Sequence, residues 1–233
     1  MTRFAFLLFP GLTQLDLTAP HEVFCRAPGA EVHLAWKTLD PVGTEHGLTM
    51  APTITLAALD RVDVLCVPGG FGVNALLGDD DVLEHLRRLA RDARYVTSVC
   101  TGALVLAAAG LLRGRRATTH WMSREFLPAF GAEPAPGRWV EDDGVITGGG
   151  VTAGLDFALH VLARLHGDGV AQAVQLAIEY DPAPPFACGH PDRAPAELVD
   201  AVRERVAPAQ RRRADLVAAA AARLGASPGR HTV

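Results

Sequence analysis

The sequence predicts an α/β domain with a mostly parallel sheet, and two recurring patterns carry that prediction. Residues 3–9 are near-continuously apolar and 63–67 indicate another buried strand, which is typical of strands that are covered on both faces; a further strand is expected at 94–99. Segments with apolar residues at helical spacing follow two of them, at 82–91 and 102–112. Strands that alternate with helices in this way build a parallel sheet with helices packed on its faces.

The alternation continues along most of the chain. In order, we expect strands at 3–9, 31–36, 63–67, 94–99 and 144–147, and helices ending near Arg26, over 82–91, over 102–112 and after Gly148-Gly149-Gly150. Residues 181–195 are rich in proline and end the regular pattern, and one or two helices follow over 196–225. We therefore expect a single α/β domain over 1–205 and a helical, Arg/Ala-rich C-terminal extension over 206–233 that frays at its end.

Composition and charge exclude several classes of protein. Hydrophobic residues make up 49% of the 233 and charged residues 21%, which excludes a mainly disordered chain. A net charge of −4 provides no overall positive field for nucleic acid. The four cysteines form no CxxC pair, so neither a disulfide framework nor a zinc ribbon is expected. The uncharged stretch Tyr95–Leu112 has polar residues in its first half, so we expect a buried strand, a turn and a helix rather than a membrane span, and a cytoplasmic protein.

Four unusual clusters follow strands of the predicted sheet. They are Asp16, Gly69-Gly70, Cys100-Thr101-Gly102 and Gly148-Gly149-Gly150. Because ligands of open parallel sheets bind outside the carboxyl ends of the strands, the clusters should meet at one edge. Cys100 is the central candidate, since a sharp turn between a strand and a helix is where a nucleophile elbow forms. Backbone N–H groups at a helix start favour a thiolate there, whereas an ordinary free cysteine is a small buried hydrophobe.

The other candidates each allow a structural and a functional interpretation. Asp16 either caps its helix or is a partly buried carboxyl with a raised pKa that donates a proton near neutral pH. Gly69 and Gly70 either form a tight turn or present N–H groups to developing negative charge. Thr101 caps its helix or touches the substrate. His120 and Trp121 line the pocket or simply pack.

Six segments together resemble the DJ-1/PfpI superfamily, and within it the isonitrile (cyclohexyl-isocyanide) hydratases. They are FPGLTQLDLTAPHEVF (9–24), VPGGFG (67–72), SVCTGALVLAAAGLL (98–112), ATTHW (117–121), TGGGVTAGLDFALH (147–160) and EYDPAPPFACGHP (179–191). The resemblance implies a flavodoxin-like three-layer sandwich and a homodimer. It places the nucleophile on Cys100, the essential carboxyl on Asp16 and the threonine that follows the nucleophile on Thr101. It implies the hydration of a small hydrophobic isonitrile to an N-substituted formamide, with no metal, flavin or nucleotide. The net charge and the polar residues within 95–112 predict that neither nucleic acid nor a membrane is a partner.

Departures from other branches of the superfamily bear on the alternatives. The protease-like branch has histidine directly after the cysteine, where this chain has Thr101, so a Cys-His peptidase is not expected. The DJ-1-like branch pairs its cysteine with glutamate, and the shorter Asp16 weakens a glyoxalase or deglycase function without excluding it. A redox sensor or chaperone that uses oxidation of Cys100 remains a non-enzymatic alternative. A ligand-sensing half of a transcription regulator would need a DNA-binding module, which we do not expect after Pro195.

Overall fold

A seven-stranded sheet forms the centre of the computed structural model, which describes residues 1–226. The strand order is β10-β11-β7-β6-β1-β2-β5, parallel except for the β10–β11 pair. The strands span Thr2–Leu7 (β1), Ala30–Trp36 (β2), Ile54–Thr55 (β5), Val64–Val67 (β6), Tyr95–Ser98 (β7), Trp139–Asp142 (β10) and Val145–Gly148 (β11). The five expected strands are present. The antiparallel edge strand β10 and the short β5 were not expected.

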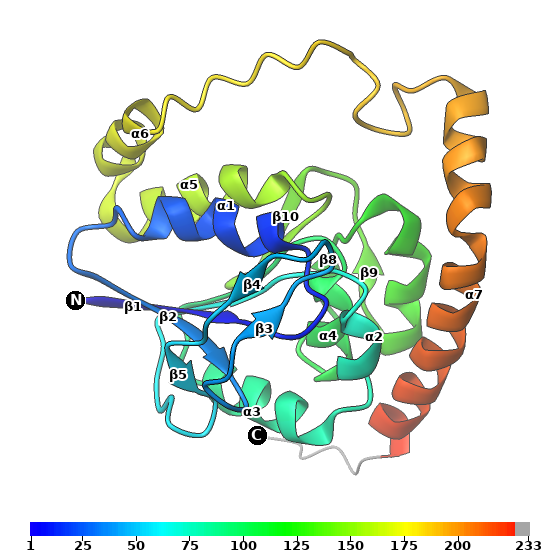
Figure 1. Ribbon diagram of the computed structural model, residues 1–233, viewed down its shortest axis with the longest axis horizontal. Helices are drawn as coiled ribbons and strands as arrows, with labels where there is room; N and C mark the ends of the chain where they lie inside the picture. The colour runs from blue at the N-terminus through cyan, green and yellow to red at the C-terminus, as the bar shows by residue number, and fades with distance from the viewer. Residues whose placement is uncertain (227–233) are drawn as a thin grey trace.

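Helices cover both faces of the sheet, which confirms the expected sandwich (Figure 1). On one side α1 packs against α5, with α6 beside α5; α2, α3 and α4 lie on the other side. These helices span Gln14–Phe24 (α1), Val73–Leu76 (α2), Asp80–Ala90 (α3), Gly102–Ala108 (α4), Ala153–His166 (α5) and Asp168–Ala177 (α6). Two small strand pairs lie outside the main sheet, β3 (Val42–Gly43) with β4 (Thr49–Met50) and β8 (Arg116–Ala117) with β9 (Glu133–Pro134).

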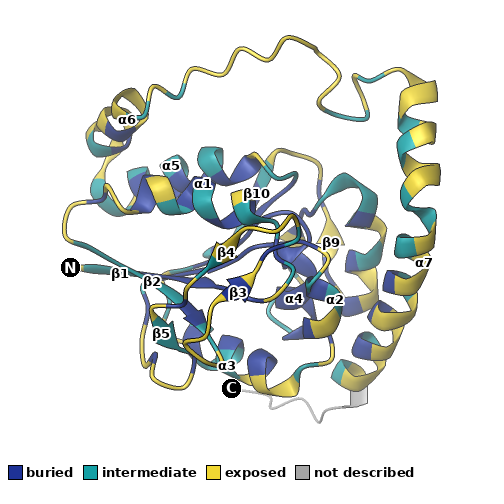
Figure 2. Ribbon diagram, in the orientation of Figure 1, coloured by how far each residue is buried: buried dark blue, intermediate teal, exposed yellow. Residues whose placement is uncertain are grey.

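The central strands are covered on both faces, as expected, and burial is highest in the middle of the sheet (Figure 2). All four residues of β6 are buried, and so are all seven of α4. The stretch at 95–112 is therefore a strand, a turn and a helix inside the core. Among the described residues, no helix is both long and apolar enough to cross a membrane.

The C-terminal part of the described chain is one long helix at the side of the molecule. After α6, residues 181–195 form a mostly exposed strap with no regular structure, which leads to α7, Ala196–Ala226 (Figures 1 and 2). α7 packs on α4 and on the 3-10 helix η1, Trp121–Phe130. The domain boundary at residue 205 stays a prediction; it falls within this single helix. Residues 227–233 of the expected extension lie outside the described part.

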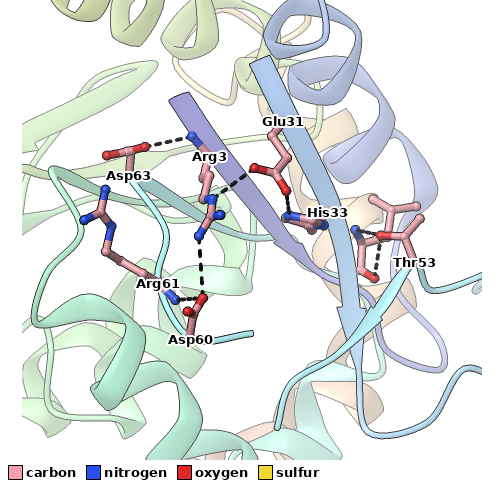
Figure 3. A network of polar contacts seen from close by, with 8 residues as sticks. Arg3, Glu31, His33, Thr53, Asp60, Arg61 and Asp63 are labelled. Carbon is pink, nitrogen blue, oxygen red and sulfur yellow. Dashed lines mark hydrogen bonds and ion pairs between the residues drawn. The ribbon is translucent and has the colours of Figure 1, made fainter. Parts of the chain in front are cut away.

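A polar network occupies the amino end of the central strands, opposite to the edge where ligands are expected (Figure 3). Arg3, near the start of β1, forms ion pairs with Glu31 at 2.9 Å and with Asp60 at 3.6 Å. Its backbone N–H donates to Asp63 at 2.7 Å. Such partly exposed pairs contribute up to about 1 kcal/mol each. We therefore expect this network to help align β1, β2 and the start of β6 rather than to take part in function.

Candidate active site

The candidate nucleophile lies on a strained turn between β7 and α4. Cys100 has φ 54°, a left-handed conformation that non-glycine residues adopt rarely and that costs on the order of 1–3 kcal/mol. Gly102 makes the turn possible, because a Cβ at this position would lie 2.1 Å from the Val67 carbonyl oxygen. The Thr119 hydroxyl donates to the Cys100 carbonyl at 2.7 Å and holds the turn from the other side. The predicted elbow is therefore present.

The Asp16 carboxyl is completely buried beside this turn, in the first turn of α1. Its Oδ2 accepts a hydrogen bond of 2.9 Å from the Gly69 N–H, whereas Oδ1 has no hydrogen-bond partner among the described residues. Burial raises the pKa of Asp16 from 3.8 to about 7, against smaller lowering effects of the Gly69 N–H and the Cys100 side chain. Of the two interpretations of Asp16, the structure favours the carboxyl with a raised pKa.

The electrostatics of Cys100 differ from the expectation of a stabilised thiolate. Its side chain is 6% exposed, and burial together with the negative charge of Asp16 raises the pKa of the thiol well above 9. The N–H and hydroxyl of Thr101 and the charge of Arg213 act in the opposite direction with smaller effect. The helix start is present, but removal of the sulfur from water outweighs it. At neutral pH the resting site therefore holds a thiol beside a carboxyl whose pKa of about 7 lets it both hold and release a proton.

The two glycines after β6, Gly69 and Gly70, lie against Asp16 and Thr101 and donate hydrogen bonds to their side chains. Gly69 allows close packing, since a Cβ there would lie 2.6 Å from the Thr101 nitrogen and 2.9 Å from Asp16 Oδ2. Gly70 has φ 126°, and its N–H donates to the Thr101 hydroxyl at 3.0 Å. Both N–H groups that were expected to face developing negative charge thus have partners within the protein. Their role toward an anion stays a prediction.

A cavity of about 170 Å³ opens over Cys100, at the carboxyl edge of the sheet where ligands were expected. Seven chain segments that are distant in sequence meet around it. Its walls are mostly apolar, and they are formed by Thr13, Glu45, Gly70, Phe71, Cys100, Thr101, His120, Met122, Val151, Val206, Ala209, Gln210 and Arg213. Gly148, Gly149 and Gly150 are not part of the wall, although Val151, which follows them, is.

The structure separates the two aromatic candidates. His120 lines the cavity, and burial lowers the pKa of its imidazole to about 4, helped by the charge of Arg213, so the ring is neutral at pH 7. Trp121 does not line the cavity over Cys100; it borders the neighbouring hollows and lies under the guanidinium of Arg203 at 5.5 Å. His120 is therefore placed to contact a ligand of Cys100, and Trp121 is placed further out.

Sequence reasoning missed the contribution of α7. Val206, Ala209, Gln210 and Arg213 from this helix form one wall of the cavity. Their spacing of i, i+3, i+4 and i+7 places them on one face of a helix. This spacing was visible in the sequence, but nothing local indicated which face of the helix packs against the domain. Thr13, Glu45, Phe71 and Met122 were missed for the same reason, because each lies in the cavity through tertiary packing.

Comparison with known proteins gives a consistent result. The family model described as "DJ-1/PfpI family" matches residues 2–164. Isonitrile hydratase of Pseudomonas putida is 51% identical over 95% of this chain and 97% of its own length. A glutathione-independent glyoxalase of Caenorhabditis elegans is 25% identical over 66% of this chain and 83% of its own.

The solved structures agree with the sequence comparisons. The crystal structure of a ThiJ/PfpI family protein from Pseudomonas syringae has a TM-score of 0.90 and 42% identity, covering 93% of this chain and 90% of that one. Drosophila melanogaster DJ-1beta, with a TM-score of 0.71 and 24% identity, shows the same fold. The matched segments contain the strained elbow, the buried carboxyl and the parallel sheet described above. The chain therefore belongs to the DJ-1/PfpI family.

Proposed function

We propose that this protein hydrates an isonitrile, R–N≡C, to the N-substituted formamide, R–NH–CHO, with Cys100 as nucleophile and Asp16 as acid and base. One observation carries the proposal: a buried carboxyl with a pKa of about 7 lies beside a cysteine on a strained elbow. A group with such a pKa both gives and takes a proton at neutral pH. The 51% identity to an isonitrile hydratase over nearly the whole chain supports this reaction in particular.

In the first step the terminal carbon of the isonitrile gains both a proton and the Cys100 sulfur. Protonated Asp16 gives its proton to that carbon, which makes it electrophilic. The Cys100 sulfur then bonds to the same carbon, and the new carboxylate takes the thiol proton. The product is a thioimidate, R–N=CH–S–Cys, and Asp16 is protonated again. This route starts from the neutral thiol, as the raised pKa of Cys100 requires.

In the second step water releases the product. Asp16 protonates the imine nitrogen and then, as carboxylate, takes a proton from the water that attacks the carbon. The tetrahedral adduct R–NH–CH(OH)–S–Cys forms, with the Thr101 hydroxyl, which hydrogen-bonds Gly70, close to the sulfur. The carbon–sulfur bond breaks, the hydroxyl proton passes through Asp16 to the sulfur, and R–NH–CHO leaves with Cys100 restored as a thiol.

The cavity supports a small hydrophobic substrate. Its walls are mostly apolar, and at about 170 Å³ it accommodates a compact group rather than a long chain. The residues of the proposed chemistry are Cys100, Asp16 and Thr101, with His120 as a contact and Gly69 as the partner that orients Asp16. By analogy with the family, we further propose a cytoplasmic homodimer.

The test is an assay of the purified protein with cyclohexyl isocyanide that follows formation of the formamide. The wild type should turn over, and Cys100→Ala should lose at least about 10³-fold in kcat/KM, because the covalent route disappears while the cavity stays. Unfolding curves of both proteins check that the variant folds. Substantial turnover by Cys100→Ala contradicts covalent catalysis. Absence of turnover by folded wild type contradicts the hydratase function and directs the assay to methylglyoxal and then to oxidation of Cys100.

A further inference from the structure

A buried arginine from α7 forms part of the cavity wall over Cys100. Arg213 is 7% exposed, although arginine is almost never this buried without a partner of opposite charge. Its Nε donates to Asn74 Oδ1 at 3.0 Å, and its Nη1 donates to Ser123 Oγ and to Gln210 Oε1, each at 3.3 Å. All three acceptors are neutral. They fix the direction of the guanidinium without cancelling its charge.

No carboxylate among residues 1–226 lies within 4 Å of Arg213. A buried charge without an ion-pair partner is costly, and strongly perturbed charged groups cluster at functional sites. Four titratable groups line this cavity or act on Cys100: Asp16 of α1, Glu45 after β3, His120 before η1 and Arg213 of α7. Glu45 Oε2 accepts from the Thr13 hydroxyl at 2.8 Å. His120 is neutral at pH 7, which leaves Arg213 as the one positive group among the described residues that line this cavity.

We propose that Arg213 is the counter-charge of the Cys100 sulfur, and that α7 thereby completes an active site whose other catalytic groups lie in residues 2–164. Partial negative charge develops on the sulfur as Asp16 takes the thiol proton, and again as the carbon–sulfur bond breaks. The fixed guanidinium stabilises that charge without reorganisation. Asp16 opposes that charge, and Arg213 acts in the opposite direction. The inference rests on the proposed role of Cys100 as nucleophile. It assigns function to a helix outside the region that the family model matches.

The experiment measures the rate of alkylation of Cys100 by iodoacetamide from pH 6 to 10 in the full chain, by mass spectrometry of the Cys100 peptide. Because the pKa of the Cys100 thiol lies well above 9, these pH values cover the rising part of the profile. In Arg213→Gln this part should move to higher pH, so the rate at pH 8 should fall severalfold, because a nearby positive charge favours the thiolate. The rate of exposed Cys25, whose charged neighbours are Glu22 and Arg26, should not change and serves as an internal control. Alkylation needs no isonitrile, so failure of the hydratase function leaves this result interpretable.

Two further variants separate charge from packing. Arg213→Lys keeps the charge and should keep the rate at pH 8 near that of the wild type. Asn74→Ala removes one hydrogen bond of the guanidinium and keeps its charge, so it should also leave this rate in place. If Arg213→Gln does not fold, Gln210→Glu places a carboxylate beside Arg213 and should lower the rate at pH 8 instead. An unchanged rate in Arg213→Gln, or in Gln210→Glu where that variant is used, overturns the proposal, as does an equal loss in Asn74→Ala.

Discussion

Replacing Asp16 by asparagine should stabilise the protein while it abolishes activity. In the unfolded chain the Asp16 carboxyl titrates near 3.8, and in the folded protein near 7. Between these values the unfolded state releases a proton that the folded state keeps, so the stability of the wild type falls as the pH rises. Above pH 7 the full difference is lost, which amounts to about 4 kcal/mol at about 1.4 kcal/mol per pH unit. Asparagine keeps the shape and an oxygen for the Gly69 N–H, and it carries no charge.

The measurement is urea unfolding of wild type and Asp16→Asn at pH 4, 5, 6, 7 and 8. Taking the difference between the two proteins cancels the titration of all other groups. The stability gap should be small at pH 4, grow through pH 5 and 6, and level off above pH 7 at up to about 4 kcal/mol in favour of the variant. A gap that does not change with pH would refute the argument, because the raised pKa of Asp16 requires this dependence.

Two further outcomes follow from the site. If protonated Asp16 starts the reaction, kcat/KM should be level below pH 7 and fall about tenfold per pH unit above it, and a profile that stays level to pH 9 contradicts that role. Gly69→Ala should cost roughly 2 kcal/mol or more in urea unfolding, since its Cβ would meet the Thr101 nitrogen at 2.6 Å. Gly150→Ala, where nothing lies within 4 Å of the added Cβ, is its matched control, and an equal cost in both variants contradicts the steric explanation.

The sequence predicted the centre of the fold because the central strands are buried on both faces. A continuous apolar run such as residues 64–67, VLCV, leaves little choice of structure, and it forms β6. The strand β10, with the sequence WVED, is short and half polar at the edge of the sheet. Its pairing depends on the turn to β11 and not on a local pattern. The antiparallel strand was therefore missed while its neighbours were found.

In the candidate site too, residues with a local sequence signal were predicted, and features that depend on tertiary packing were missed. Cys100 and Asp16 were identified from the sequence because each follows a strand, and strand ends converge at one edge of a parallel sheet. The direction of the Cys100 pKa was wrong, since the helix start was visible in the sequence and the depth of burial was not. The α7 wall was missed because three arginines in succession, Arg211, Arg212 and Arg213, look alike until packing buries one of them.

Residues 181–195 are mostly exposed and have no regular structure. The cavity is therefore built from two parts of the chain that this strap connects. One part carries Cys100, Asp16 and Thr101, and the other, α7, carries one wall of the cavity, Arg213 included. Mutations in α7 at wall positions other than Arg213 can therefore reshape what the cavity admits while the elbow and its carboxyl keep their geometry. Selectivity and chemistry can diverge at different rates in such a protein, so relatives that share the elbow need not share substrates.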